Sequence, residues 1–153
     1  PSQQIVRLSG EDLRAGLEGC DLLVVNRYEF EMLRERTGLS NEAMRSAPAR
    51  ACVITLGVEG AHVWEGGELC AIPPVPPERI DDPTGGGDAF RAGLMRGLAL
   101  GLSWDLAGRM GALAATYVLE RPGPQGHHYT LAEFVARFRQ HFDDGGALDQ
   151  LLD

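Results

Sequence analysis

The sequence has no apolar run long enough to span a membrane, and its first residues lack the charged and apolar regions of a signal peptide. These absences argue against a membrane protein, a membrane partner and secretion, and they predict a soluble, cytoplasmic protein. The chain begins at Pro1 without a methionine, in a segment that resembles the middle of a longer sequence. We therefore consider truncation or processing.

Cysteine is also scarce. The three cysteines, Cys20, Cys52 and Cys70, cannot all pair within the chain, and none has the short spacing of a zinc or redox motif. The adjacent His127 and His128 have no cysteine or acidic residue at ligand spacing, which favours an exposed loop over a metal site. We expect reduced thiols and no certain metal site built directly from side chains.

Positive charge is in deficit as well. The chain has 14 Lys and Arg residues against 22 Asp and Glu residues, which gives a formal net charge of -8. This balance argues against a nucleic-acid partner, because affinity for a phosphate backbone comes largely from Lys and Arg. A local site for a small anion is still compatible with it, since backbone amides and a divalent cation can hold the phosphates of a nucleotide.

Apolar residues make up 44% of the 153 residues, which is enough to build the core of one globular domain. Continuous apolar runs at Leu22–Val25 and Ala51–Thr55 predict strands buried in a parallel sheet. The segments Ala61–Trp64 and Leu69–Ile72, joined through a glycine pair, predict a β-hairpin.

Helical patterns alternate with these strands and then dominate the end of the chain. Caps, glycine stops and apolar spacing predict helices at about residues 9–19, 26–37, 88–100, 103–118 and from 130 onward. Gly93 and Gly97 should permit close packing of the helix that contains them. The expected caps and stops are Ser9 with Asp12, Gly38, Ser103, and Thr130 with Glu133. The proline-rich stretch 73–77 predicts an extended connector. In the last helix, the residues expected to face inward are Leu131, Phe134, Val135 and Phe138. The alternation predicts an α/β layered fold with a mostly parallel sheet, a β-hairpin and a helical carboxy-terminal end.

The segment Asp82–Asp88 carries three glycines, Gly85, Gly86 and Gly87, ahead of a helix. Their N–H groups are unobstructed by side chains and lie beside the positive end of the helix dipole, which predicts an anion hole. Asp88, in the first turn, could accept the proton of a hydroxyl that attacks a bound phosphoryl group. The alternative is a flexible loop followed by an acidic residue that complements the dipole.

This segment resembles the D-T-x-G-A-G-D signature of the ribokinase-like (PfkB) carbohydrate and nucleoside kinases, with Pro83 and Gly86 as departures. Upstream, Asn26–Glu29 is similar to the N-x-x-E element of that family, and Thr55–Gly60 is similar to its T-x-G-x-x-G nucleotide loop. Taken alone, the first is also a helix cap and the second a plain loop. Each motif follows an apolar or extended segment, so we expect all three to converge at the carboxyl edge of one sheet.

The resemblance implies a partial ribokinase-like (Rossmann-like) fold and a kinase that depends on ATP and Mg2+. It implies that Asp88 is the catalytic base, that Gly85, Gly86 and Gly87 form the anion hole, and that Asn26 and Glu29 serve magnesium and phosphate. The residues implied to bind ATP are Thr55, Gly57, Gly60 and Gly123.

A monovalent cation site is also implied by the resemblance. Asp82 and Thr84 match positions that in many relatives help bind a cation such as K+. His127, however, stands where ribokinases often have serine, which argues against potassium activation.

The resemblance further implies that residues 1–153 are the carboxy-terminal, ATP-binding part of a larger kinase, without the amino-terminal acceptor-binding half and its lid. The acceptor would be a sugar or a nucleoside, and the segment Glu120–Tyr129 is more similar to bacterial adenosine-kinase-like members. A homodimer or an association with the missing half is the expected protein partnership. The alternatives are a nucleotide-binding fragment or module without independent activity, and a structural α/β domain that binds no ATP.

Overall fold

The computed structural model describes residues 2–153, the side chain of Ser2 excepted. The chain divides into two compact units, the first ending at Ala71 and the second running from Ile72 to Asp153. Each unit has its own buried interior.

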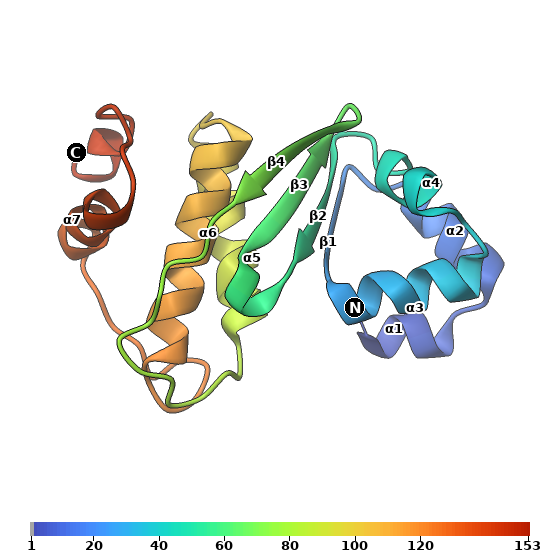
Figure 1. Cartoon of the computed structure of the whole chain (residues 1–153), viewed down its shortest axis with the longest axis horizontal. Helices are drawn as coiled ribbons and strands as arrows, with labels where there is room; N and C mark the ends of the chain where they lie inside the picture. Colours follow the sequence, from blue (N-terminus) through green and yellow to red (C-terminus); the bar gives the residue numbers. More distant parts are fainter. Residues whose placement is uncertain (1) are drawn as a thin grey trace. The chain divides into compact units, whose positions relative to one another are not determined.

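The first unit is an α/β layer in which α3 and α4 pack against strands, and α1 and α2 pack on α3 (Figure 1). In chain order its elements are α1 (Ser2–Arg7), α2 (Gly10–Glu18), β1 (Leu22–Asn26), α3 (Arg27–Thr37), α4 (Asn41–Ser46), β2 (Ala51–Thr55), the 3-10 helix η1 (Gly57–Glu59), β3 (Ala61–Glu65) and most of β4 (Glu68–Ile72).

The sheet has the strand order β1-β2-β3-β4. β1 and β2 run parallel, whereas β2 and β3 run antiparallel. The predicted hairpin is confirmed as β3 and β4, and the sheet is therefore mixed rather than mostly parallel. The physical reason is that a two-residue turn joins antiparallel strands, while a parallel pair needs a longer crossover such as the one through α3 and α4.

Helix ends in the first unit follow signals present in the sequence. Ser9 and Asp12 form a reciprocal capping box at the start of α2, and Gly38 ends α3 in the left-handed conformation, both as predicted. α1 and α4 were not predicted, because six residues are too few to display a helical period, although Ser40 caps α4. The buried cluster of this unit comprises Ile5, Leu13, Leu17, Val25, Phe30, Leu33, Met44, Cys52 and Ile54.

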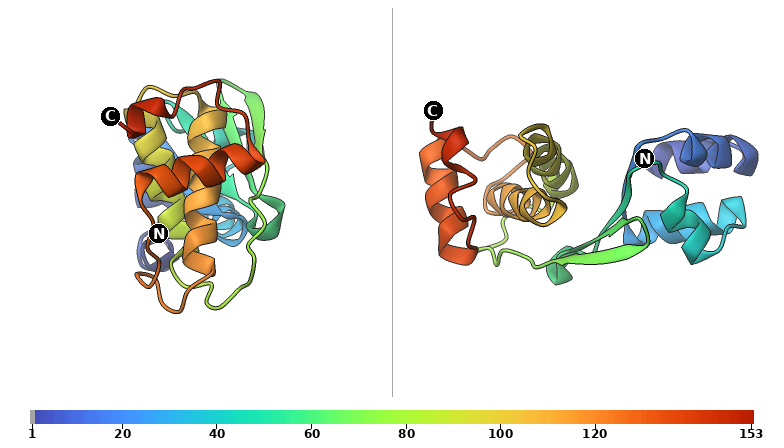
Figure 2. Two further views of the ribbon diagram at one scale, coloured as in Figure 1. Left: turned by 90° about the vertical axis from the view of Figure 1, so that its left-hand side faces the viewer. Right: turned by 90° about the horizontal axis from the view of Figure 1, so that it is seen from above.

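The second unit is helical. It contains the extended connector 73–85, α5 (Gly86–Ala99), α6 (Trp104–Leu119), α7 (Leu131–His141) and the 3-10 helix η2 (Asp149–Leu151), and α7 runs across the α5–α6 pair (Figure 2). The predicted caps at Ser103, and at Thr130 with Glu133, are confirmed. α5 begins at Gly86 rather than at Asp88, so two of the three glycines belong to its first turn.

α5 and α6 approach closely because small residues face one another. A Cβ on Gly93 would lie 2.6 Å from the carbonyl oxygen of Met110 and 2.8 Å from the Cα of Gly111. A Cβ on Gly97 would lie 2.6 Å from the Cα of Ala107. The prediction that Gly93 and Gly97 permit close packing is confirmed, and the pair of helices supports the loop that precedes α5.

The buried face of α7 was predicted correctly except at its first residue. Leu131 is 50% exposed, because it begins the helix where the chain is still arriving from the preceding loop. Arg139 near the helix end forms two bonds of 2.9 and 3.0 Å with the carboxylate of Asp144, which holds the pKa of Asp144 down at about 2. The residues of α7 that are buried are Phe134, Val135 and Phe138.

Among residues 2–153, no helix combines the length and the apolar character needed to cross a membrane. In the same part of the chain, no group of three or more His, Cys, Asp or Glu side chains is placed to hold a metal ion. Cys20, Cys52 and Cys70, all within the described residues, form no disulfide, and burial raises the pKa of the Cys52 thiol to about 12.

The close α5–α6 contact predicts that replacing glycine by alanine lowers the stability at position 93 but raises it at position 16. Gly93→Ala should destabilise the chain by about 1–3 kcal/mol, because the new methyl group overpacks against backbone atoms of α6. Gly16→Ala, in α2 with no atom within 4 Å of the added Cβ, should stabilise it by about 0.5–1 kcal/mol. Urea unfolding of both variants measures the difference, and equal effects would contradict the close contact.

Candidate functional site

Two of the three motifs meet at the carboxyl ends of β1 and β2. Asn26 and Thr55 are Cα partners in the parallel ladder, each the last residue of its strand. The Thr55 hydroxyl donates to the carbonyl oxygen of Val25 across this pair at 3.4 Å. The expected convergence is therefore observed for these two motifs within the first unit.

Asn26 and Glu29 bind each other at the start of α3. The Asn26 side-chain oxygen accepts from the Glu29 amide at 2.8 Å, and the Glu29 carboxylate accepts from the Asn26 amide at 3.0 Å. Glu29 is only 4% exposed, whereas Asn26 is exposed. Asn26 and Glu29 thus form the helix cap that the sequence allows. The same two hydrogen bonds hold the buried Glu29 carboxylate at the edge of the sheet.

The loop after β2 is held in shape by its own backbone. The Leu56 amide donates to the carbonyl oxygen of Gly60 at 2.8 Å, and both Gly57 and Gly60 have positive φ. Arg27, the first residue of α3, bonds to Glu59 of this loop at 3.0 Å. The two motifs are therefore joined both by the pairing of their strands and by this ion pair.

The third motif lies in the second unit, in the turn before α5. Gly85 is the N-cap of α5 with φ of 90°, a left-handed conformation that favours glycine. A Cβ there would also lie 2.6 Å from the Cβ of Pro124. Both the backbone angle and the contact therefore require glycine at this position.

The amides of this turn differ in what they bind. The Gly86 amide donates to Pro83 at 3.3 Å, and the Asp88 amide donates to Gly85 at 3.0 Å. Within the described residues, the N–H groups of Gly85 and Gly87 have no acceptor. Two free donors thus lie beside the positive end of the α5 dipole, where an anion is stabilised.

Asp88 projects from the first turn of α5 with 82% of its side chain exposed. Its carboxylate is 2.6 Å from a guanidinium nitrogen of Arg91, one turn along the helix. In this pair the carboxylate contacts the guanidinium and remains accessible to solvent. An exposed carboxylate therefore lies in the same helix turn as the Gly87 amide.

Asp82 ties the turn to the segment that follows α6. One carboxylate oxygen accepts from the Thr84 amide at 2.8 Å, and the other accepts from the Gly123 amide at 3.0 Å. These hydrogen bonds, first those from Thr84 and then that from Gly123, lower the pKa of Asp82. Gly123 consequently uses its amide to hold the loop, and Pro124 follows as the contact of Gly85.

A pocket of about 420 Å3 opens beside this turn within the second unit. Gly85 and Asp88 line it together with residues of α5 and α6 and with the segment 124–131. His127 and Tyr129 form part of the wall, with ring centroids 5.8 Å apart, and the Nδ1 atom of His127 is buried without a partner. The volume is within the range of small-molecule sites, about 300–1,000 Å3.

Residues 4–129 match the family model described as pfkB family carbohydrate kinase, and this is most of the chain. The chain belongs to the pfkB family of carbohydrate kinases. The resemblance predicted from the three motifs is thereby confirmed, while the roles of individual residues stay predictions.

The pfkB chain is similar to several nucleoside kinases. A nucleoside kinase of Methanothermobacter thermautotrophicus is 29% identical over 138 residues, covering 90% of this chain and 44% of the relative. A cytidine kinase of Thermococcus kodakarensis is 37% identical over 117 residues, covering 67% of this chain and 42% of the relative. The solved structure of the Burkholderia thailandensis nucleoside kinase in complex with inosine has a TM-score of 0.90 and 37% identity, covering 93% of this chain and 47% of that one. The chain thus spans less than half the length of these relatives.

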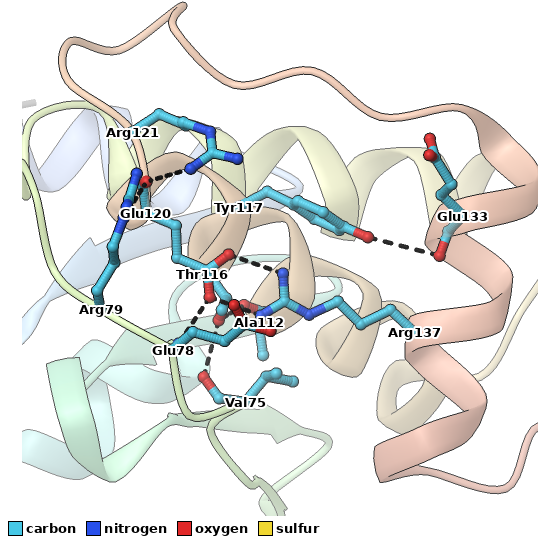
Figure 3. A network of polar contacts seen from close by, with 10 residues as sticks. All are labelled: Val75, Glu78, Arg79, Ala112, Thr116, Tyr117, Glu120, Arg121, Glu133 and Arg137. Carbon is cyan, nitrogen blue, oxygen red and sulfur yellow. Dashed lines mark hydrogen bonds and ion pairs between the residues drawn. The ribbon is translucent and has the colours of Figure 1, made fainter.

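A buried ion pair connects α6, α7 and the connector near the pfkB signature (Figure 3). Arg137 forms two bonds of 2.6 and 2.8 Å with the carboxylate of Glu120, which also accepts from the Glu78 amide at 2.8 Å. The guanidinium lies 4.7 Å from the ring centroid of Tyr117. The hydrogen bonds from Arg137 lower the pKa of Glu120, and that carboxylate raises the pKa of Arg137.

Sequence reasoning missed the contacts that fix the signature. Asp88 and Arg91 are three residues apart on a helix, a spacing that indicates an ion pair and could have been used. Asp82 and Gly123 are 41 positions apart, and Glu120 and Arg137 are 17 apart. No local pattern reveals such pairs.

The Glu120 pair predicts a pH-dependent stability. Because its pKa is lowered on folding, the pair stabilises the chain above the ordinary glutamate pKa of about 4.3, and this stabilisation is lost as the pH falls through the lower folded value. Glu120→Gln should therefore cost about 1–3 kcal/mol at pH 7, and less below about pH 4. Urea unfolding at both pH values tests this.

Asp105→Asn provides the matched control, because it removes a more exposed carboxylate from an arginine pair on α6. Its cost should stay below about 1 kcal/mol. A loss for Glu120→Gln that is no larger, or that does not shrink in acid, would contradict the role of the buried pair.

Proposed function

We propose that this chain carries the nucleotide site and the base of a kinase that transfers the γ-phosphoryl group of ATP to a hydroxyl of a sugar or nucleoside. The observation that carries the proposal is the turn before α5, where two free amides, the helix terminus and an exposed carboxylate lie together. Phosphoryl transfer needs this combination, because catalysis rests on positioning and on charge stabilisation.

The proposed step uses the turn at two points. The N–H groups of Gly85 and Gly87 stabilise the negative charge on the transferred phosphoryl group. Asp88 accepts the proton of the attacking hydroxyl, whose oxygen forms the new bond to phosphorus while the bond to the β-phosphate oxygen breaks and ADP leaves. Arg91 keeps the carboxylate of Asp88 aligned before the proton arrives.

Asn26 and Glu29 fit the requirements of a Mg2+ site. Magnesium is commonly held by one or two carboxylates, with the remaining positions filled by water and substrate phosphates, so no cluster of protein ligands is needed. The side-chain oxygens of Asn26 and Glu29 are of the type this ion prefers, and Thr55 adjoins Asn26 in the sheet. When bound, the ion would neutralise phosphate charge. A K+ site at Asp82 and Thr84 stays a prediction from the resemblance alone. Each carboxylate oxygen of Asp82 accepts a hydrogen bond from a backbone amide, so these contacts give the K+ site no further support.

A nucleoside is the acceptor that the comparisons favour. The relatives described above are named nucleoside and cytidine kinases, and the Burkholderia thailandensis enzyme was solved with inosine. The aromatic pocket beside Asp88 suits a small flat ring rather than a polymer. ATP as the donor and cysteines that form no disulfide both fit a reducing cytoplasm.

A narrower function for the chain by itself is supported by its length relative to the nucleoside kinases. Because it spans less than half of them, we propose that it binds nucleotide without completing transfer unless an acceptor-binding half is present. That half would be supplied by the remainder of a longer chain or by a partner.

The base is tested by Asp88→Asn in a version of the protein that includes the acceptor-binding half. The amides of the turn are unchanged, so ATP should still bind, while loss of the proton acceptor should lower kcat by about 10²–10⁴-fold. Transfer from labelled ATP across a panel of nucleosides and sugars measures the effect. Turnover near that of the unaltered protein would exclude Asp88 as the base.

The matched control is Asp105→Asn, which removes another first-turn carboxylate paired with an arginine one turn along. It should leave turnover unchanged. The 153-residue chain alone should show a nucleotide-dependent rise in Tm with ATP or ADP and Mg2+ but no appreciable transfer. Rapid turnover by this chain alone would contradict the narrower function.

Glu29→Gln separates a magnesium role from capping in the same longer version. Glutamine keeps an oxygen that accepts from the Asn26 amide, so α3 should remain capped and the Tm should change little. Loss of the charge should raise the Mg2+ concentration needed for half-maximal activity by roughly tenfold. An unchanged magnesium titration would leave Glu29 as a cap only.

A further inference from the structure

A second pocket lies in the first unit, at the amino end of β2. Its volume is about 460 Å3, and it is bounded by α4, the segment 48–50, Trp64 and the turn between β3 and β4. Trp64 is the partner of Cys52 in the antiparallel ladder, whereas Thr55, which belongs to the nucleotide loop, lies at the opposite end of β2. The pocket is therefore separate from the motifs of the proposed kinase site.

The wall of this pocket contains a cation that the protein does not neutralise. The guanidinium carbon of Arg45 lies 4.2 Å from the ring centroid of Trp64. Within the described residues, no carboxylate pairs with Arg45 and no oxygen accepts a hydrogen bond from it. The Nε atom of Arg45 and the Nε1 atom of Trp64 are both buried without an acceptor.

Among the described residues, the Arg45 and Trp64 N–H groups are unpartnered donors in the same pocket wall, so they favour a ligand that accepts hydrogen bonds. Buried donors normally have partners, and both of these groups donate without being able to accept. Arg45 stands in the last turn of α4, where a positive charge complements the helix dipole. The dipole explains the charge, but it leaves both N–H groups unsatisfied.

The residues that line the pocket indicate which class of ligand it would bind. A guanidinium presents parallel donors that match the two oxygens of a planar carboxylate. Arg45, Arg50 and Glu42 line the pocket, so their formal charges sum to a single positive charge. That sum suits a monoanion better than a doubly charged phosphate. Pro48 and Ala49 offer apolar contact to the body of such a molecule, and the volume suits a small organic ligand.

We propose that this pocket binds a small organic monocarboxylate, held by Arg45 with the Trp64 indole N–H as a further donor. Because protein atoms cover both donors, binding turns the Arg45 side chain from the indole ring toward the ligand. The site is independent of the proposed phosphoryl transfer, since it lies at the other end of β2 and uses none of the same residues.

The indole N–H of Trp64 provides a direct measurement. The chain has two tryptophans, so a ¹⁵N-labelled sample has two indole signals, which Trp64→Phe assigns. Titration with sodium benzoate and sodium acetate, against sodium chloride at the same ionic strength, should move the Trp64 signal saturably and leave Trp104 in place. Inorganic phosphate should produce no saturable shift.

Two variants test the residues that carry the proposal. Arg45→Lys keeps the charge but loses the planar donors, so benzoate should bind at least about tenfold more weakly. Glu42→Gln removes the opposing charge, so benzoate should bind more tightly. Circular dichroism and the Trp104 signal establish that each variant is folded. The proposal is overturned if neither carboxylate moves the Trp64 signal, if phosphate moves it as strongly as benzoate, or if Arg45→Lys binds benzoate unchanged.

Discussion

The backbone at Gly85 must turn left-handed while it touches Pro124, and the geometry of the signature depends on this constraint. A side chain there would meet Pro124 and would oppose the positive φ. Asp82 secures the same contact from the other side, because it binds the amide of Gly123, the residue before Pro124. The amides of Gly85 and Gly87 therefore remain unoccupied because the loop is held by other groups.

The position of that turn is set by α6. The connector is fastened along this helix at successive points: the Thr116 hydroxyl donates to the Val75 carbonyl at 2.8 Å, Glu120 accepts from the Glu78 amide, and the Asp81 amide donates to the Leu119 carbonyl at 2.8 Å. The prolines of the connector cannot form a ladder of their own, so the helix supplies the order. The chain then enters α5, which packs against α6 through its glycines.

Most helices and strands could be predicted from local sequence patterns. The contacts between residues far apart in the sequence could not. The capping boxes and both parallel strands were predictable because a few neighbouring residues determine them. The start of α5 at Gly86 was not predictable from helix propensity, since glycine disfavours helix interiors but is tolerated in the first turn when the N-cap geometry is fixed elsewhere. The candidate site divides in the same way. Asp88 and the glycines were identified from their motif, whereas the bonds of Asp82 and Glu120 to distant residues needed the fold.

The proposed nucleotide site relies on backbone amides, and many of the chain's basic residues are engaged in ion pairs elsewhere in the fold. All 14 basic residues are arginines, and many pair with carboxylates inside the fold. The planar guanidinium of arginine matches the two oxygens of a carboxylate. An arginine that is paired in this way is not available to bind phosphate. The arginines that form such ion pairs include Arg27, Arg34, Arg79, Arg91, Arg109, Arg137 and Arg139. In the proposal, backbone amides bind the phosphate, and their direction is set by the loop rather than by a side-chain rotamer. Arg45 differs from these arginines, because it stacks on the Trp64 indole without a carboxylate partner among residues 2–153, and in our proposal its N–H groups bind a carboxylate ligand instead.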